Sequence, residues 1–181
     1  MQLIIIRGPA GSGKSSVARE LHDTAAQKTA LLSLDVFRVN IAKEQEGAAP
    51  ITAEIIGHAA KKFLDAGYTV ILEGIFNLQK DCYKNLFEEL FDYNQGSNHL
   101  YFLEISLQES IRRNTQRPKG RIINEDAMRE WYPKAKKSGY ELEQVIDVEK
   151  TTLADTVEQI ANECGLNLDT DNYKKHIKSS V

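Results

Sequence analysis

The sequence predicts an α/β fold in which a parallel β-sheet is covered by helices on both faces. Short apolar runs alternate with segments of helical periodicity along most of the chain, and such alternation is typical of repeated βαβ units. A glycine-rich octapeptide lies between the first apolar run and the first helical segment. The length of 181 residues suits one domain with a substantial core.

Five apolar runs are the predicted strands: Leu3–Ile6, Ala30–Leu34, Thr69–Leu72, Leu100–Ile105 and Val145–Val148. Parallel strands joined by right-handed crossovers bring their carboxyl ends to one edge of the sheet, and ligands bind at that edge. All the candidate functional residues named below fall at these strand ends or just beyond them, so we expect them to meet in space.

Helical periodicity predicts helices over Ser16–Gln27, from Thr52 to Ala66 and over Gln79–Tyr93. In the second of these, Thr52 is the expected N-terminal cap, Gly67 is the expected stop, and the expected inward face is a set of apolar residues. Those apolar residues are Ile55, Ile56, Ala59, Ala60, Phe63 and Leu64.

Capping patterns mark the starts of three further helices. Ser106-Leu107-Gln108-Glu109 has the form of a capping box, in which a serine and a glutamate bind each other's backbone N–H groups. Asn124 is expected to cap the next helix, and Thr152-Leu153-Ala154-Asp155 is expected to begin a further helix that ends near Cys164-Gly165.

The composition is that of an ordinary soluble globular protein, with 41% hydrophobic and 27% charged residues. The formal net charge of −3 gives no reason to expect nucleic acid or an anionic membrane as a partner. No apolar stretch has the length of a membrane-spanning helix. The cysteines Cys82 and Cys164 lack metal-ligand spacing and are expected to be unpaired thiols, so we expect a cytoplasmic protein.

The octapeptide Gly8–Ser15 reads Gly-Pro-Ala-Gly-Ser-Gly-Lys-Ser and fits the pattern G-x-x-x-x-G-K-[ST]. In this pattern backbone N–H groups point at phosphate oxygens, the lysine (Lys14) reaches the β- and γ-phosphates, and the final hydroxyl (Ser15) ligates Mg²⁺. A following helix adds its N-terminal dipole. The strand–loop–helix context therefore predicts a nucleoside triphosphate site.

Asp35 and Arg38 directly follow the second predicted strand. Phosphoryl transfer needs an acceptor hydroxyl that is oriented and whose proton is accepted, and Asp35 suits that role. Arg38 suits an acidic group of the acceptor or the phosphate in transfer. The alternative for Asp35 is a helix cap that serves the segment Phe37–Lys43.

Glu73 ends the third predicted strand and precedes Gly74. One interpretation is that its carboxylate holds water on Mg²⁺ or orients the acceptor. The other interpretation is that Glu73 only forms an ion pair with Arg38 or with an arginine of the lid described next. The residues themselves leave both open.

Arginines gather beyond the fourth strand at Arg112, Arg113, Arg117 and Arg121. Arg113 and Arg117 are four residues apart, so we expect them on one face of a helix. A basic segment at this place, covering about residues 113–137, is typical of a lid that brings guanidinium groups to the transferring phosphoryl group. Arg112 is expected to face solvent.

The acceptor is expected to lie among residues 38–52, the turn Glu73–Asn77, and Trp131 and Tyr132, which follow the lid arginines. The loop Asp147–Thr151 is either a border of the adenine site or a plain turn. The sequence does not identify the acceptor.

The chain resembles the small phosphate-loop kinases, in particular zeta-toxin-type kinases, chloramphenicol phosphotransferase and the kinase domain of phage polynucleotide kinase. The resemblance rests on Gly8–Ser15, on Asp35-x-Phe37-Arg38, on Ile71-Leu72-Glu73-Gly74 and on Arg113-Asn114-x-x-Arg117. It implies a P-loop NTPase fold, a three-layer α/β/α sandwich with a five-stranded parallel sheet in the order 2-3-1-4-5 and a basic lid.

The resemblance also implies an ATP-dependent kinase in which Asp35 is the general base, Glu73 faces the acceptor and lid arginines contact phosphates. The chain lacks the larger helical extensions of the toxins, so neither a sugar-nucleotide acceptor nor toxicity carries over. It also shows no basic–aromatic patch that would bind a nucleic acid strand. A P-loop kinase domain over residues 1–168 and a polar tail over 169–181 are the expected organisation.

The expected site has three parts. The residues expected to bind ATP are Gly8, Pro9, Ala10, Gly11, Ser12, Gly13, Lys14, Ser15, Ser16 and Arg113. The expected catalytic residues are Lys14, Asp35, Arg117 and Arg121, and Ser15 is the expected Mg²⁺ ligand. The residues expected to meet a small hydroxylated acceptor are Asp35, Arg38 and Glu73.

Two other functions share these motifs. A nucleoside or nucleotide kinase would use every residue named above. A nucleotide-dependent switch or binding module would use the phosphate loop alone, but such a protein needs neither an acceptor base nor a closing lid.

Overall fold

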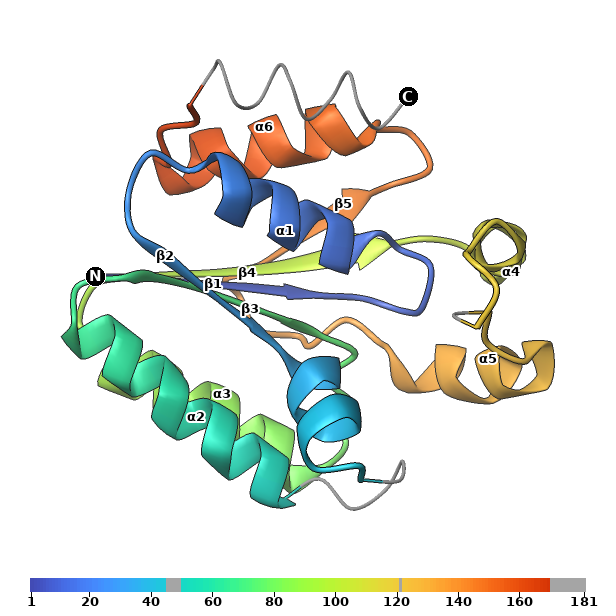
Figure 1. Ribbon diagram of the computed structural model, residues 1–181, viewed down its shortest axis with the longest axis horizontal. Helices are drawn as coiled ribbons and strands as arrows, with labels where there is room; N and C mark the ends of the chain where they lie inside the picture. Colours follow the sequence, from blue (N-terminus) through green and yellow to red (C-terminus); the bar gives the residue numbers. More distant parts are fainter. Residues whose placement is uncertain (45–49, 121, 170–181) are drawn as a thin grey trace.

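A five-stranded parallel sheet forms the middle layer of the computed structural model, which describes residues 1–44, 50–120 and 122–169. The strand order is β2-β3-β1-β4-β5, and every neighbouring pair is parallel (Figure 1). The strands are β1 Gln2–Arg7, β2 Thr29–Ser33, β3 Thr69–Gly74, β4 Ser97–Glu104 and β5 Glu143–Asp147. The predicted α/β fold, its three layers and its strand order are confirmed.

Two pairs of helices cover the two faces of the sheet (Figure 1). Helices α1 Lys14–Thr24 and α6 Leu153–Cys164 pack on one face, and α2 Pro50–Asp65 and α3 Asp81–Tyr93 pack on the other. The shorter elements lie at or beyond the carboxyl ends of the strands (Figure 1). They are the π-helix η1 Val36–Ile41, α4 Leu107–Thr115, α5 Glu125–Trp131 and the 3₁₀ turn η2 Tyr132–Lys134.

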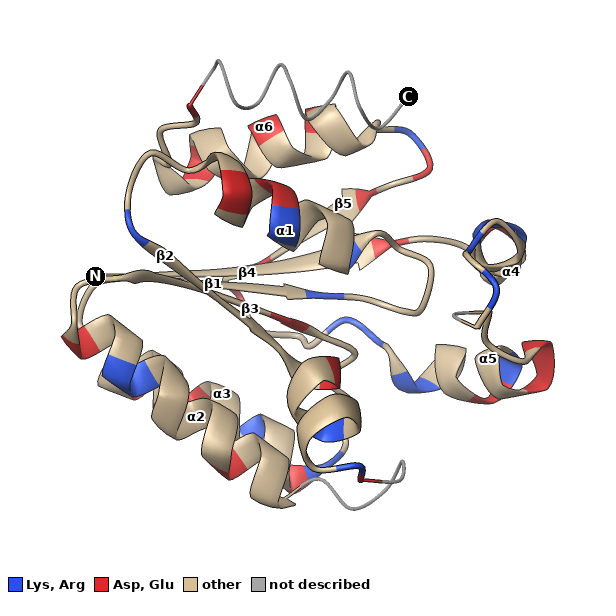
Figure 2. Cartoon of the chain, viewed as in Figure 1, with Lys and Arg blue, Asp and Glu red and all other residues tan. Residues whose placement is uncertain are grey.

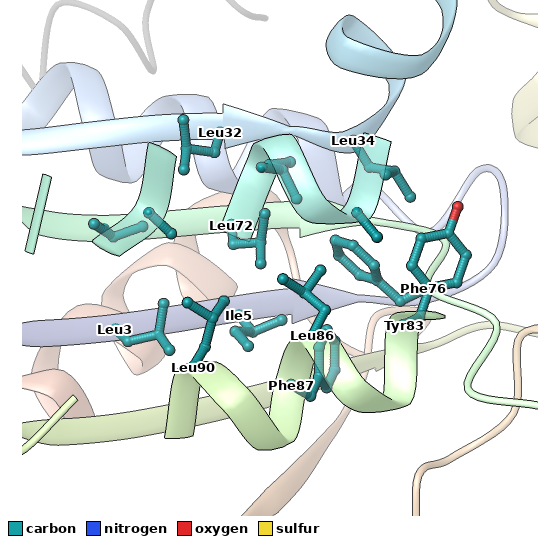
Figure 3. Close-up of a cluster of buried hydrophobic side chains, with 14 of the residues drawn as sticks. Leu3, Ile5, Leu32, Leu34, Leu72, Phe76, Tyr83, Leu86, Phe87 and Leu90 are labelled. Carbon is teal, nitrogen blue, oxygen red and sulfur yellow. The ribbon is translucent and has the colours of Figure 1, made fainter. Parts of the chain in front are cut away.

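The core consists of two apolar clusters, one on each face of the sheet. The first joins β1, β2 and β3 to α2 and α3 and contains the rings of Phe76, Tyr83 and Phe87, which pack edge-to-face (Figure 3). The second joins the opposite face to α1 and α6. Residues Leu3–Ile6 are fully buried because β1 lies between both clusters, as strands of parallel sheets do.

Helix α2 departs from the prediction at its start and in its inward face. It begins at Pro50, two residues before Thr52. Proline suits the first position of a helix, because the N–H group that it lacks would have no hydrogen-bond partner there. Thr52 lies inside the helix, and its hydroxyl donates to the Glu44 carboxylate. Ile55 and Phe63 are largely exposed, so their expected burial was wrong. The buried face consists of Thr52, Ala53, Ile56, Gly57, Ala60 and Leu64.

The capping predictions are confirmed at Asn124 and Thr152 and only half confirmed at Ser106. The Ser106 hydroxyl accepts from the Glu109 N–H at 3.2 Å, but the Glu109 carboxylate binds arginines, and the Ser106 N–H donates to Glu149 at 2.7 Å. Thr152 and Asp155 form a complete capping box.

Of the predicted polar tail, the structure describes only Asp169, whose N–H donates to the Thr24 carbonyl at 2.6 Å. Within the described ranges, no helix combines the length and the apolar character that a membrane crossing requires.

Candidate active site

The phosphate loop connects β1 directly to α1, which begins at Lys14. Two glycines in it stand where no other residue fits. Gly8 has φ +154° and a Cβ there would lie 2.6 Å from the Leu103 carbonyl oxygen, while Gly11 has φ +80° and sits against Ser110. The Ser110 hydroxyl donates to the Ala10 carbonyl at 2.5 Å, so α4 is attached to the loop.

The Lys14 ammonium is buried at the centre of the site, with 6% of the residue exposed. Its only hydrogen bond to described residues goes to the Pro9 carbonyl oxygen at 3.4 Å. Burial lowers the pKa of Lys14 below its usual value, the nearby carboxylates of Glu73 and Asp35 raise it, and Arg117 lowers it. The two predicted carboxylates and the predicted lid arginine therefore act electrostatically on one lysine.

Glu73 lies at the end of β3 and is 4% exposed. One carboxylate oxygen accepts from the Ser15 hydroxyl at 3.0 Å, and the other accepts from the Ser33 hydroxyl. Among the described residues Glu73 forms no ion pair, so the interpretation that it pairs with Arg38 or with a lid arginine was wrong for each of these arginines that the structure describes. The strands β1 and β3 carry their charged residues only at or near their carboxyl ends (Figure 2).

Ser33 is a site residue that the sequence analysis missed. It ends β2 beside Glu73, its partner in the β2–β3 register. A serine at a strand end carries no distinctive sequence signal. However, the carboxyl ends of parallel strands share one edge of the sheet, and this argument, which identified Asp35 and Glu73, applies equally to Ser33.

Asp35 follows β2 and precedes η1. Its carboxylate forms no capping hydrogen bond with that helix, so the cap interpretation was wrong. Oδ1 instead accepts from the Arg38 guanidinium at 3.2 Å, in a pair whose side chains are 55% and 21% exposed. Asp35 thus presents an accessible carboxylate that is partly neutralised by its neighbour.

The described arginines of the predicted cluster after β4 form two groups: Arg112 and Arg113 lie on α4, and Arg117 lies beyond its end. Arg112 and Arg113 both pair with Glu109, and Arg113 also donates to the Val148 carbonyl at 2.7 Å, next to the loop after β5. Helix α4 ends at Thr115, so Arg117 lies beyond it, and the expected helix face shared with Arg113 was wrong.

Arg117 and Trp131 from the lid segment line a cleft of about 990 Å³ at the carboxyl edge of the sheet. The opposite walls come from the phosphate loop, η1 and the turn after β3, and they include Lys14, Asp35 and Glu73. Tyr132, which was expected near the acceptor, donates instead to the Ile105 carbonyl at 2.7 Å. Arg121 and residues 45–49 lie outside the described residues, so the prediction for Arg121 stays a prediction.

Arg7, at the end of β1, is a second residue that the sequence analysis missed. It is 1% exposed, forms an ion pair with Glu143 at 2.7 Å, and donates to the carbonyl oxygens of Phe76 at 3.0 Å and Lys136 at 2.7 Å. Burial lowers its pKa and Glu143 partly offsets this. One guanidinium group thus holds together the chain before the phosphate loop, the turn after β3 and the chain returning from the lid.

Several solved structures share this fold at low sequence identity. A sugar kinase from Janibacter sp. HTCC2649 has a TM-score of 0.67 and 18% identity, and the match covers 90% of this chain and 93% of that chain. A gluconokinase from Sinorhizobium meliloti 1021 has a TM-score of 0.67 and 19% identity over 91% and 94% of the two chains. The tunicamycin resistance protein of Deinococcus radiodurans has a TM-score of 0.64 and 19% identity over 92% and 97%.

Comparison with curated protein sequences finds no match. The sequence profile of a family described as an AAA domain matches residues 3–130, which include the phosphate loop, Asp35, Glu73 and the arginines that follow β4. A match of this extent establishes membership, and the chain belongs to this AAA domain family, with a fold like that of the P-loop kinases.

Proposed function

We propose that this protein is a kinase that transfers the γ-phosphoryl group of ATP to a hydroxyl group of a small molecule. The observation that carries the proposal is the shared cleft, in which the phosphate loop, an accessible aspartate and a lid arginine face one space. A nucleotide switch has no use for the aspartate as an acceptor base, because it transfers no phosphoryl group to an acceptor hydroxyl. The family match and the likeness to P-loop kinases support the same function.

On the donor side, we assign the β- and γ-phosphates to the phosphate loop and Lys14. Ser15 and Glu73 offer oxygen ligands 3.0 Å apart, and hard oxygen donors are what Mg²⁺ prefers. Mg²⁺ commonly takes one or two protein ligands and completes its shell with phosphates and water, so the pair fits it. The bound ion would neutralise charge on the phosphates, and Glu73 would keep the Ser15 hydroxyl proton turned away from it.

On the acceptor side, we assign Asp35 as the general base and Arg38 as its partner. The Arg38 guanidinium binds Oδ1 of Asp35, which leaves Oδ2 to accept the proton of an acceptor hydroxyl. Arg117 is assigned to the charge that develops on the transferring phosphoryl group, and Arg121 to the same task. Arg113 is assigned to the nucleotide from its place beside the loop after β5.

The test is a screen for ADP release with a panel of hydroxylated metabolites, followed by mass spectrometry of the product. The panel includes sugars and sugar acids, because a sugar kinase and a gluconokinase share the fold, and nucleosides, which separate the nucleoside kinase alternative. If no compound stimulates ADP release while ATP and ADP change the binding of a protein partner, the switch hypothesis replaces this proposal.

The residue test is Asp35→Asn, which keeps the size of the side chain and removes its basicity. We expect kcat to fall by about 10² to 10⁴-fold while the dissociation constant of MgATP stays within a factor of a few. Asp65→Asn is the control, because Asp65 lies on the surface and accepts from Tyr93 at 2.5 Å. Unchanged turnover in Asp35→Asn would remove the assignment of the base.

A further inference from the structure

The acceptor half of the cleft contains a buried tyrosine whose hydroxyl group forms no hydrogen bond within the described part of the chain. Tyr83 is 4% exposed, and its ring packs edge-to-face on Phe76 with ring centroids 5.6 Å apart. Figure 3 shows the ring at the edge of the first apolar cluster, with its oxygen at the end of the ring that is directed away from Leu86 and Phe87. Among the described residues this oxygen has no hydrogen-bond partner, and Tyr83 lines the cleft.

Two further residues beside Tyr83 line the cleft and offer hydrogen-bond donors. Lys80 is half-buried, and it forms no ion pair with the part of the chain that the structure describes. Asn77 Oδ1 accepts from the Gln79 N–H at 3.1 Å, which leaves the amide NH₂ group of Asn77 as the free end of this side chain. The three residues lie close together, because the Lys80 N–H donates to Asn77 and the Tyr83 N–H donates to Lys80.

The same place is the N-terminus of α3, a helix of 13 residues whose cap residue, Lys80, provides no side-chain acceptor. The N–H groups of Lys80 and Tyr83 are already paired, so this terminus contributes mainly the partial positive charge of the helix dipole. The nearby carboxylates are already engaged, since Asp35 pairs with Arg38 and Glu44 accepts from Thr52. Asp81, in the first turn of α3, is exposed and does not line the cleft.

We propose that Asn77, Lys80 and Tyr83 form a subsite for an oxyanion on the phosphoryl acceptor. This inference rests on the proposed kinase function and names its substrate class, an alcohol that also carries a carboxylate or phosphate group. The three side chains present an ammonium, an amide NH₂ and a phenolic hydroxyl, all of which donate, and Lys80 adds the positive charge. A neutral polyol would place no negative charge beside the Lys80 ammonium group. The Tyr83 phenol stays protonated at neutral pH, because burial raises its pKa to about 12.

The test compares alcohols in matched sets that differ in the anionic group: glucose, gluconate and glucose 6-phosphate, and glycerol, glycerate and glycerol 3-phosphate. We measure kcat/KM for ADP release by the protein of 181 residues. We expect at least one oxyanion-bearing member to exceed its neutral partner by about tenfold or more, the usual effect of a charge-assisted hydrogen bond. The carboxylate and phosphate members of each set separate the two kinds of oxyanion.

The variants Lys80→Gln and Tyr83→Phe should each reduce this preference by about fivefold or more and leave the MgADP dissociation constant unchanged. Lys84→Gln removes the same charge one turn along α3, where Lys84 pairs with Glu88 at 3.8 Å, and Tyr93→Phe removes a surface hydroxyl. Both controls should keep the preference. Faster turnover of the neutral alcohols, or an unchanged preference in both variants, overturns the subsite and leaves the kinase standing. Absence of ADP release with these alcohols and with the wider metabolite panel overturns the kinase and the subsite together.

Discussion

At the scale of single residues, Lys14 shows a conflict between folding and binding. An ammonium group that is buried with one 3.4 Å hydrogen bond has lost most of its hydration, and burial accordingly lowers its pKa. Glu73 compensates only in part, because its two oxygens are held by the Ser15 and Ser33 hydroxyls. The site is therefore arranged for phosphates that supply the missing negative charge.

This conflict predicts the behaviour of Lys14→Met. Because the charge is disfavoured in the folded state, the free energy of unfolding of the nucleotide-free protein should rise by about 1 kcal/mol. The MgATP dissociation constant should rise about a hundredfold, since a charge-assisted contact is lost. Urea denaturation and calorimetric titration measure the two effects. Lys62→Met, on the exposed face of α2, should change neither, and a large loss of stability in Lys14→Met would contradict the account.

At the scale of elements, α4 is stabilised by charges at its own start. Glu109, in the first turn, pairs with Arg112 at 2.6 Å and with Arg113 at 2.8 Å. Hydrogen bonds from these two arginines lower the pKa of the Glu109 carboxyl from its usual value of 4.5 to about 2, and the bond from Arg112 has the larger effect. The same contacts keep Arg113 at the loop after β5, so this carboxylate also determines where a proposed nucleotide-binding residue lies.

The depressed pKa of Glu109 gives a pH dependence with a defined sign. A carboxyl whose pKa is lower in the folded state stabilises the protein above its unfolded pKa, and this stabilisation is lost as the pH falls towards the folded value. Glu109→Gln should therefore be less stable than the wild type at pH 7, and the difference should shrink between pH 4.5 and about 2. Denaturant titrations across this range measure it. The control is Glu158→Gln, at an exposed position on α6. Its difference in stability from the wild type should not shrink in this way between pH 4.5 and about 2.

At the scale of the whole molecule, the Arg7–Glu143 pair links the sheet to the chain that returns from the lid. Its partners are 136 residues apart in sequence, and their side chains are 1% and 3% exposed. Glu143 also accepts from the Ser138 N–H at 2.5 Å, and the Arg7 guanidinium lies 5.2 Å from the centroid of the Phe102 ring. Removing one member would leave the other charge buried without compensation.

Glu143→Ala should therefore lower the free energy of unfolding by about 3–5 kcal/mol, as measured by urea denaturation. The matched control is Glu125→Ala, whose ion pair with Arg129 is 2.6 Å long but has both side chains 55% exposed. That exposed pair should contribute little, because water and salt screen it. Equal effects of the two substitutions would show that burial does not decide the strength of these pairs.

The predictable part of this protein came from local patterns. Alternating apolar runs and helical periodicity identified the strands and helices, side-chain caps marked the starts after Asn124 and Thr152, and the phosphate loop appeared as a contiguous pattern. Asp35 and Glu73 were found because strand ends of a parallel sheet share one edge. Errors arose where packing competes with pattern, as in α2, where the helix rotates Ile55 and Phe63 outward.

By itself the sequence determined the α/β architecture and the place of the phosphate loop in it, because periodicity, caps and the phosphate loop depend on residues close together in the chain. Only the tertiary structure decided the partners of Glu73, the buried pair of Arg7 with Glu143, and the open hydroxyl of Tyr83. Each of these depends on groups brought together from distant segments. Their burial and unused hydrogen-bonding capacity exist only once the two faces of the sheet are covered.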